Sequence, residues 1–153
     1  MAFISLQDEE KSKSVIMIFV EGTILKPKSK FFLYNHKSYI PIGNAVSLID
    51  NWHKQGAEIV YCTSRKGKQA EDMAILLSKF GFCGTRIYYR DKKQKYKDII
   101  ETVKPNYLIE DDCKSIGGKW QMCITYVAQN IRDSICSIVV KEFGGIDEVT
   151  INL

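Results

Sequence analysis

The sequence lacks any long apolar run. No window approaches the roughly 18 apolar residues that a membrane-spanning helix requires, and the first residues, MAFISLQDEEKSKS, contain no apolar stretch long enough for a signal peptide. Internal repeats and low-complexity segments are also absent. For a chain of 153 residues, 45% of them hydrophobic, we expect one soluble domain, with residues 1–13 as an N-terminal extension.

The composition argues against several kinds of site. The five cysteines are odd in number and include no CxxC pair, so neither a zinc site nor a disulfide framework is indicated, and a reducing, cytoplasmic setting is expected. With only two histidines, His36 and His53, surface or packing roles are favoured over a metal or acid–base site. The net charge of +4 is spread along the chain, which does not indicate a nucleic-acid face. The densest basic run, residues 90–97, opens a predicted helix and suits an anionic substrate.

Short apolar runs alternate with helical patterns, which predicts an α/β fold with a mainly parallel five-stranded sheet. Unbroken hydrophobicity is typical of strands buried on both faces of such a sheet. The predicted strands are residues 15–20, 58–62, 86–89, 107–109 and 137–140. Helices are predicted from apolar spacing in residues 46–53, 73–80 and 96–103, and a short one around 128–133. Residues 24–41 are expected to form a flap or hairpin.

Polar side chains follow three of the predicted strands, at the edge where ligands bind in open α/β sheets. Glu21–Thr23 follow the first strand, Thr63–Arg65 the second and Glu110–Asp112 the fourth. Neighbouring carboxylates raise one another's pKa unless a cation such as Mg²⁺ neutralises them; alternatively, Asp112 caps a turn and the other acids are solvated. Hydroxyl and amide groups after the second strand can hold a phosphate oxygen or simply cap a helix.

These three strand ends, in this order, resemble the haloacid dehalogenase superfamily of phosphotransferases. Its members carry D-x-D-G-T after the first strand, Thr or Ser after the second, a lysine at a later helix start and an acidic pair after the fourth. Here the corresponding stretches are FVEGT, VYCTSR and YLIEDD, with Lys97 as the lysine, although Lys93 or Lys95 could take its place. The resemblance covers residues 15–140 and implies a capless, three-layer α/β/α Rossmann-like fold.

The resemblance also implies roles for individual residues. In such enzymes the first aspartate attacks phosphorus and the second protonates the leaving group. The implied pocket contains catalytic residues Glu21, Thr63 and Lys97; phosphate-binding residues Gly22, Thr23, Thr63, Ser64 and Lys97; and metal ligands Glu21, Asp111 and Asp112.

The sequence departs from the family pattern at the attacking position. Phe19 stands where the nucleophilic aspartate would be, and Glu21 replaces the general acid. A phenyl ring can neither attack phosphorus nor bind a metal, so covalent catalysis through residue 19 is excluded and the Mg²⁺ site is weakened. We expect an impaired phosphatase-type domain that keeps a pocket for a phosphorylated small molecule and Mg²⁺. The alternatives are a slow hydrolase in which Glu21 activates water, or a protein-interaction domain without activity.

Two other residues near these strand ends are given structural roles. Cys113 follows the acidic pair, but no neighbour in the sequence could serve as its general base. Trp120 is expected to pack in the core rather than to cover the pocket.

Overall fold

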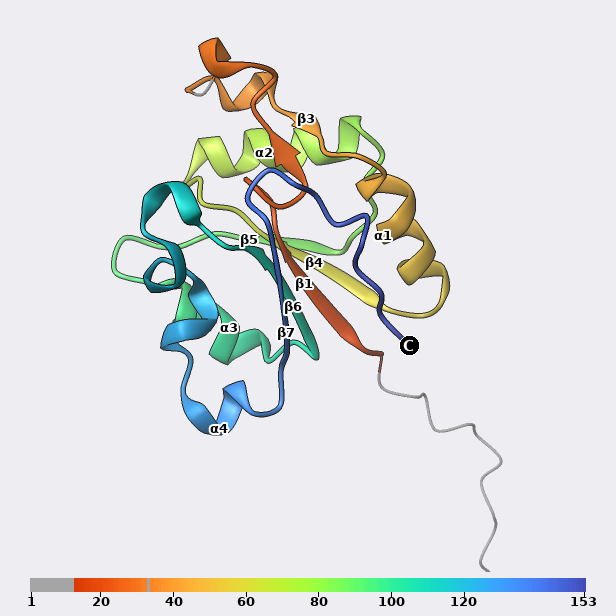
Figure 1. The fold of residues 1–153 in the computed structure, drawn as a ribbon, viewed down its shortest axis with the longest axis vertical. Coiled ribbons are helices and arrows are strands. Elements are labelled where there is room, and N and C mark those ends of the chain that lie inside the picture. Colours follow the sequence, from red (N-terminus) through yellow and green to blue (C-terminus); the bar gives the residue numbers. More distant parts are fainter. Residues whose placement is uncertain (1–12, 33) are drawn as a thin grey trace, which may run out of the picture.

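The computed structural model describes residues 13–32 and 34–153, so the predicted N-terminal extension lies almost wholly outside the described residues. Five parallel strands form the central sheet in the order β5, β4, β1, β6, β7 (Figure 1). They are β1 (Val15–Phe19), β4 (Glu58–Cys62), β5 (Arg86–Tyr88), β6 (Tyr107–Asp111) and β7 (Cys136–Val140). The five predicted strands are therefore confirmed, and the first and fourth of them, β1 and β6, are neighbours as the resemblance implies.

Helices cover both faces of this sheet, which gives three layers (Figure 1). On one face lie α1 (Ala45–Lys54) and α2 (Lys68–Lys79), and on the other lie α3 (Tyr96–Val103) and the short α4 (Gln129–Arg132). At 12 residues, α2 is the longest described helix, and no helix among the described residues is long and apolar enough to cross a membrane.

The two hydrophobic cores follow from the alternation of side chains along β1. Ile16, Ile18 and Val20 pack against α1 and α2, whereas Met17 and Phe19 point to the opposite face, toward α3. All five side chains are buried, because helices cover β1 from both sides. Residue 19 is thus the last member of the apolar column on the α3 face.

Residues after β1 form a small second sheet. Strands β2 (Leu25–Lys26) and β3 (Ile40–Pro41) pair antiparallel, and the segment between them holds the 3₁₀ turns η1 (Lys30–Phe32) and η2 (His36–Ser38). The imidazole Nε2 of His36 lies 3.0 Å from a carboxylate oxygen of Asp72 on α2, which ties this segment to the helix.

Two expectations about burial are wrong. The two outer strands are not buried on both faces, since Cys136, Ser137 and Val139 are exposed on β7 and Arg86 is exposed on β5. Trp120 is not in the core: its exposed fraction is 62%. It lies in a run of short 3₁₀ turns after β6, namely η3 (Lys114–Ile116), η4 (Gly118–Trp120) and η5 (Cys123–Tyr126).

Candidate functional site

A cavity of about 480 Å³ lies at the carboxyl ends of β1 and β6. It is where an open α/β sheet offers its ligand site. Both Glu21 and Asp111 line it, so the structure brings together the predicted groups that follow the first and fourth strands. The other lining groups include the rings of Phe19, Tyr39 and Tyr96.

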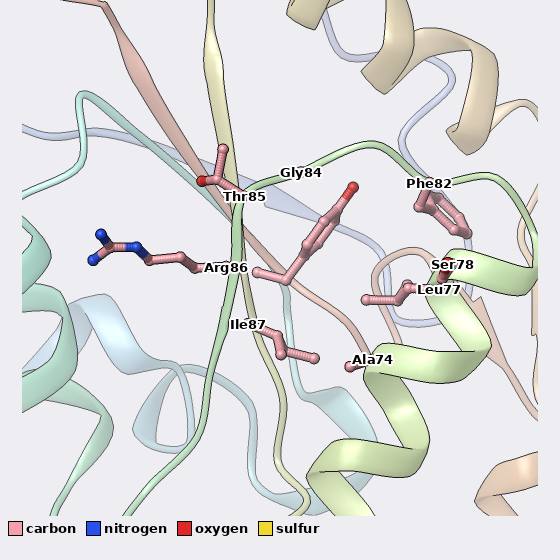
Figure 2. A pocket seen from close by; sticks show the side chains of 9 residues that line it. Ala74, Leu77, Ser78, Phe82, Gly84, Thr85, Arg86 and Ile87 are labelled. Carbon is pink, nitrogen blue, oxygen red and sulfur yellow. The ribbon is translucent and has the colours of Figure 1, made fainter.

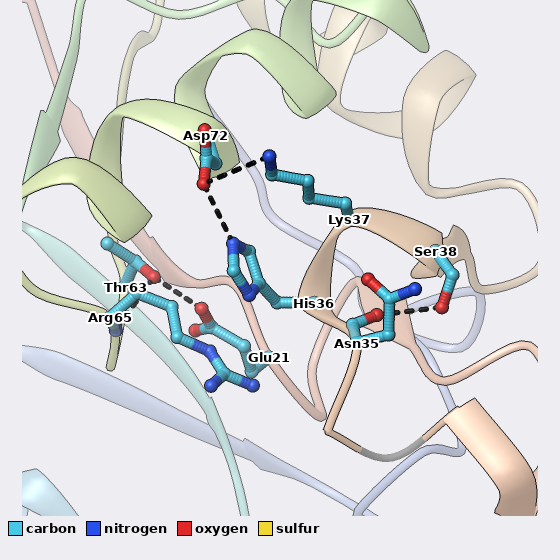
Figure 3. Close-up of polar contacts among 8 residues, drawn as sticks. All are labelled: Glu21, Asn35, His36, Lys37, Ser38, Thr63, Arg65 and Asp72. Carbon is cyan, nitrogen blue, oxygen red and sulfur yellow. Dashed lines mark hydrogen bonds and ion pairs between the residues drawn. The ribbon is translucent and has the colours of Figure 1, made fainter.

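The carboxylate of Glu21 is held by the end of β4 (Figure 3). The hydroxyl of Thr63, which is fully buried, donates a hydrogen bond to Glu21 Oε1, and the backbone N–H of Ser64 donates to Oε2 at 3.0 Å. These are the hydroxyl and amide that the resemblance assigns to a phosphoryl group. In this structure an internal anion already accepts both hydrogen bonds.

Asp111 lies against the turn that follows β1. Its carboxylate accepts hydrogen bonds from the hydroxyl of Thr23 at 3.3 Å and from the backbone N–H of Cys113 at 3.0 Å. Gly22 has φ of +83°, and a Cβ at that position would lie 3.0 Å from Asp111 Oδ1. Only glycine therefore meets both the backbone conformation and the close approach of the carboxylate.

Burial governs the electrostatics of this strand end. It raises the pKa of Asp111, and the nearby carboxylate of Glu142 acts in the same direction, while the hydrogen bonds from Cys113 and Thr23 oppose it. Burial, followed by the charge of Asp111, also raises the pKa of the Cys113 thiol, to about 12. A thiol so rarely ionised is a poor nucleophile, which agrees with the structural role expected for Cys113.

The remaining two acids of the Glu110–Asp112 run are held by other partners, although Glu110 also lines the cavity. One carboxylate oxygen of Asp112 accepts from the backbone N–H groups of Lys114 and Glu142, at 3.2 and 3.3 Å, so Asp112 caps a turn and does not line the cavity. Glu110 is buried and accepts from the N–H groups of Cys123 and Ile124, at 2.7 and 3.1 Å. It anchors the loop that carries η5 to strand β6.

Phe19 completes the apolar packing at the position that the resemblance assigns to the nucleophile. Its ring meets that of Tyr96 edge to face, with centroids 5.4 Å apart and planes at 76°, and only 8% of the residue is exposed. Because Tyr96 is the first residue of α3, this contact joins the end of β1 to the start of that helix.

The predicted lysine does not line the cavity that holds Glu21 and Asp111. Lys97 and Lys95 instead line a second cavity of about 470 Å³, whereas Lys93 lines neither. Arg90 belongs to both cavities, and its guanidinium carbon lies 4.0 Å from the ring centroid of Tyr96. Sequence reasoning noted Arg90 only as the first residue of the basic run, and its place at the junction was missed.

The donor set does not fit a magnesium ion held by several side chains. Among residues 13–32 and 34–153, no three His, Cys, Asp or Glu side chains are grouped so that they could hold a metal ion. Of the three predicted metal ligands, Glu21 and Asp111 line the cavity and Asp112 does not. The carboxylates of Glu21 and Asp112 already accept hydrogen bonds from the protein. We therefore assign no chemical step to a metal.

A third hollow, of about 260 Å³, lies between α2 and the β4–β5 edge of the sheet (Figure 2). Its walls are mostly apolar, with Leu77, Phe82 and Ile87 among them, and the Tyr61 hydroxyl donates to the backbone carbonyl of Cys83. Burial raises the pKa of Tyr61 well above its usual value. No group in this hollow is arranged for acid–base or nucleophilic chemistry, so it is packing space rather than a site.

The sequence matches no known family model and no curated protein. Solved structures do resemble it. The class C acid phosphatase from Bacillus anthracis has a TM-score of 0.61 at 15% identity, over 89% of this chain and 70% of that one. The D,D-heptose 1,7-bisphosphate phosphatase from B. bronchiseptica, solved with magnesium and phosphate, has a TM-score of 0.51 at 14% identity, over 88% and 96%.

A chain of the Pnkp1/Rnl/Hen1 complex is also similar, with a TM-score of 0.61 at 13% identity. The match covers 88% of this chain but only 48% of that one, and 45% in a second structure of the complex, so this chain spans about half the length of that relative. Identities this low establish the fold rather than the activity. The chain therefore shares the α/β fold of these phosphatases, which is the fold that its strand-end motifs predict.

Proposed function

We propose that this chain is a catalytically impaired phosphatase-type domain that binds a phosphorylated small molecule without cleaving it. The observation that carries the proposal is the end of β1, where the buried ring of Phe19 occupies the attacking position and packs on Tyr96. No lone pair is available there to attack phosphorus.

Glu21 supports the same conclusion. Its carboxylate accepts hydrogen bonds from Thr63 and Ser64, the donors that would otherwise hold a phosphoryl group. A negative charge at this point repels a phosphate, so in this proposal the phosphate of the ligand lies beside this strand end rather than in it. Glu21 is also a poor candidate to activate water, because both of its carboxylate oxygens already accept hydrogen bonds from the protein.

Two further features belong to the proposal. The segment 24–41 serves as a flap, an idea supported by Tyr39, which lines the cavity, and by the contact between His36 and Asp72. All five cysteines are free, which supports a single domain working in a reducing, cytoplasmic setting.

The proposal is tested with a generic aryl phosphate and Mg²⁺. We expect no turnover above background for the unmodified chain, nor for Asp111→Asn. Turnover by the unmodified chain that disappears in Asp111→Asn would contradict the proposal and favour hydrolysis by a non-covalent route. A positive control is the double variant Phe19→Asp/Glu21→Asp, which supplies an attacking carboxylate and shortens the side chain that holds Thr63. We expect it to gain turnover, and Glu21→Asp alone to stay silent.

A further inference from the structure

The second cavity, lined by Lys95, Lys97 and Trp120 among others, differs in character from the acidic strand end beside it. We call it the basic–aromatic cavity. Its lining residues are Arg90, Lys95, Tyr96, Lys97, Trp120, Gln121, Met122, Cys123 and Tyr126. Three of these are cationic, three are aromatic and none is acidic. Its volume, about 470 Å³, lies within the range of small-molecule sites, about 300–1,000 Å³.

The cations of this cavity form no close ion pairs within the described ranges, and of the three only Arg90 also borders the cavity at the acidic strand end. Arg90, Lys95 and Lys97 form no ion pair with any acid in the described part of the chain. The Nε of Arg90 is buried and has no hydrogen-bond partner among the described residues. A buried donor without a partner carries a desolvation cost, and an anionic ligand would remove that cost. Lys119 adds positive charge nearby, with Nζ 4.8 Å from the ring centroid of Trp120.

The aromatic walls are exposed but fixed in place. Trp120 and Tyr126 are 62% and 54% exposed, and the hydroxyl of Tyr126 donates to the backbone carbonyl of Trp120 at 2.6 Å. The hydroxyl of Thr125 donates to the carbonyl of Lys119, also at 2.6 Å. Buried Glu110 holds the same loop through its bonds to Cys123 and Ile124. Exposed rings that are held in position in this way suit the stacking of a planar ligand.

From these features we propose that the basic–aromatic cavity binds a nucleoside monophosphate. The phosphate would pair with Arg90, Lys95 and Lys97 through charge-assisted hydrogen bonds, and the base would stack on Trp120 or Tyr126. The amide of Gln121, which offers both donors and an acceptor, is available to the edge of the base. The ligand binds beside the acidic strand end and not in it, since Glu21 and Asp111 would repel its phosphate. This inference rests on the proposed function only in that the bound ligand stays uncleaved.

Tryptophan fluorescence of the full chain offers a direct test, because the two tryptophans differ in exposure. Trp52 is 2% exposed and Trp120 is 62% exposed, so a ligand that stacks in the cavity quenches Trp120 alone. We expect AMP to give saturable quenching that Trp120→Phe abolishes. Adenosine and inorganic phosphate, each with half of the recognised chemistry, should bind at least about 10-fold more weakly. Equal affinity for inorganic phosphate, or no quenching by AMP, would overturn the proposal.

Equilibrium dialysis with labelled AMP tests the cations independently of any optical signal. The double variant Lys95→Gln/Lys97→Gln should weaken binding by about 10-fold or more, whereas Lys79→Gln on α2, across the sheet, should not change it. Unchanged binding in the double variant, with an unchanged unfolding midpoint, would overturn the site. A single-stranded oligonucleotide that binds more tightly than AMP would overturn the assignment to a free nucleotide.

Recovery of the ligand after dialysis separates this inference from the proposed function. Binding with AMP recovered intact supports both. Binding followed by release of adenosine and phosphate would keep the cavity but contradict the absence of catalysis, and no binding with no turnover would overturn the cavity alone.

Discussion

Replacing Phe19 by alanine tests whether this residue stabilises the core or only lines the cavity. Only 8% of the residue is exposed, and its ring contacts that of Tyr96 edge to face, with centroids 5.4 Å apart. Truncation of a buried phenylalanine costs about 3–5 kcal/mol, of which an aromatic pair accounts for about 0.5–1.5 kcal/mol. Because the side chain also lines a cavity that already exists, we expect the lower end, about 3 kcal/mol of unfolding free energy.

Urea unfolding followed through the buried Trp52 measures this loss, and a thermal scan should show a midpoint lower by about 6–12 °C. Phe31→Ala is the matched control, since Phe31 is 94% exposed and its truncation should change stability by less than about 0.5 kcal/mol. Phe19→Leu, which keeps most of the volume, should cost less than about 1.5 kcal/mol. A loss below about 1 kcal/mol in Phe19→Ala would show that Phe19 is not held in the core.

Two other substitutions test the turn after β1 and the flap anchor. Gly22→Ala should lower the unfolding free energy by more than about 1 kcal/mol. The loss should exceed that of Gly56→Ala, because Gly56 also has a positive φ but no atom lies within 4 Å of a Cβ placed there. Equal losses would refute the contact with Asp111. The hydrogen bond from His36, aided by the charge of Lys37, lowers the pKa of Asp72. The stability that this interaction contributes is therefore fully present above the ordinary carboxyl pKa of about 4, and it is lost as the pH falls through the lower pKa of the folded state. Asp72→Asn should therefore be less stable than the unmodified chain at pH 6, and the difference should shrink as the pH falls below about 4. Urea unfolding across this range measures the difference, and a constant difference would contradict the assignment.

The strands could be predicted because their burial leaves a plain signal. Residues 15–20 and 59–62 are unbroken apolar runs, and both lie in central strands covered on two faces. The position of the edge strand β7 was predicted from its sequence, but its exposure was not. A strand with one neighbour in the sheet can be as apolar as a strand with two. The helix at Tyr96–Val103 was predicted with its end, since Pro105 disfavours helical geometry in the residue before it.

The site was harder to predict, because proximity in the sequence does not fix where side chains point. The consecutive residues Glu110, Asp111 and Asp112 bind different backbone donors, since alternate residues of a strand lie on opposite faces and a turn begins at the third. Glu110 and Asp111 still border one cavity, whereas Asp112 does not. Lys97 was chosen as the family lysine from its place in the chain. One helical turn at the start of α3 instead directs Lys97 into the neighbouring cavity, and Trp120, expected in the core, lines the same cavity.

Phe19 and Glu21 are best understood together, because Glu21 accepts the hydrogen bonds that a phosphoryl group would otherwise accept. With a phenyl ring in the position that the resemblance assigns to the nucleophile, nothing requires the cavity to accept a phosphoryl group. The hydroxyl of fully buried Thr63 accepts a hydrogen bond from the backbone N–H of Arg65 at 3.2 Å, but without Glu21 it would lack an acceptor for its own proton. A buried polar group without a partner costs about 1–3 kcal/mol. Glutamate, one methylene longer than aspartate, places its carboxylate on both Thr63 and the Ser64 amide. Restoring aspartate at residue 19 alone would thus leave the anion site filled by Glu21, which is why the return of activity should require both positions to change.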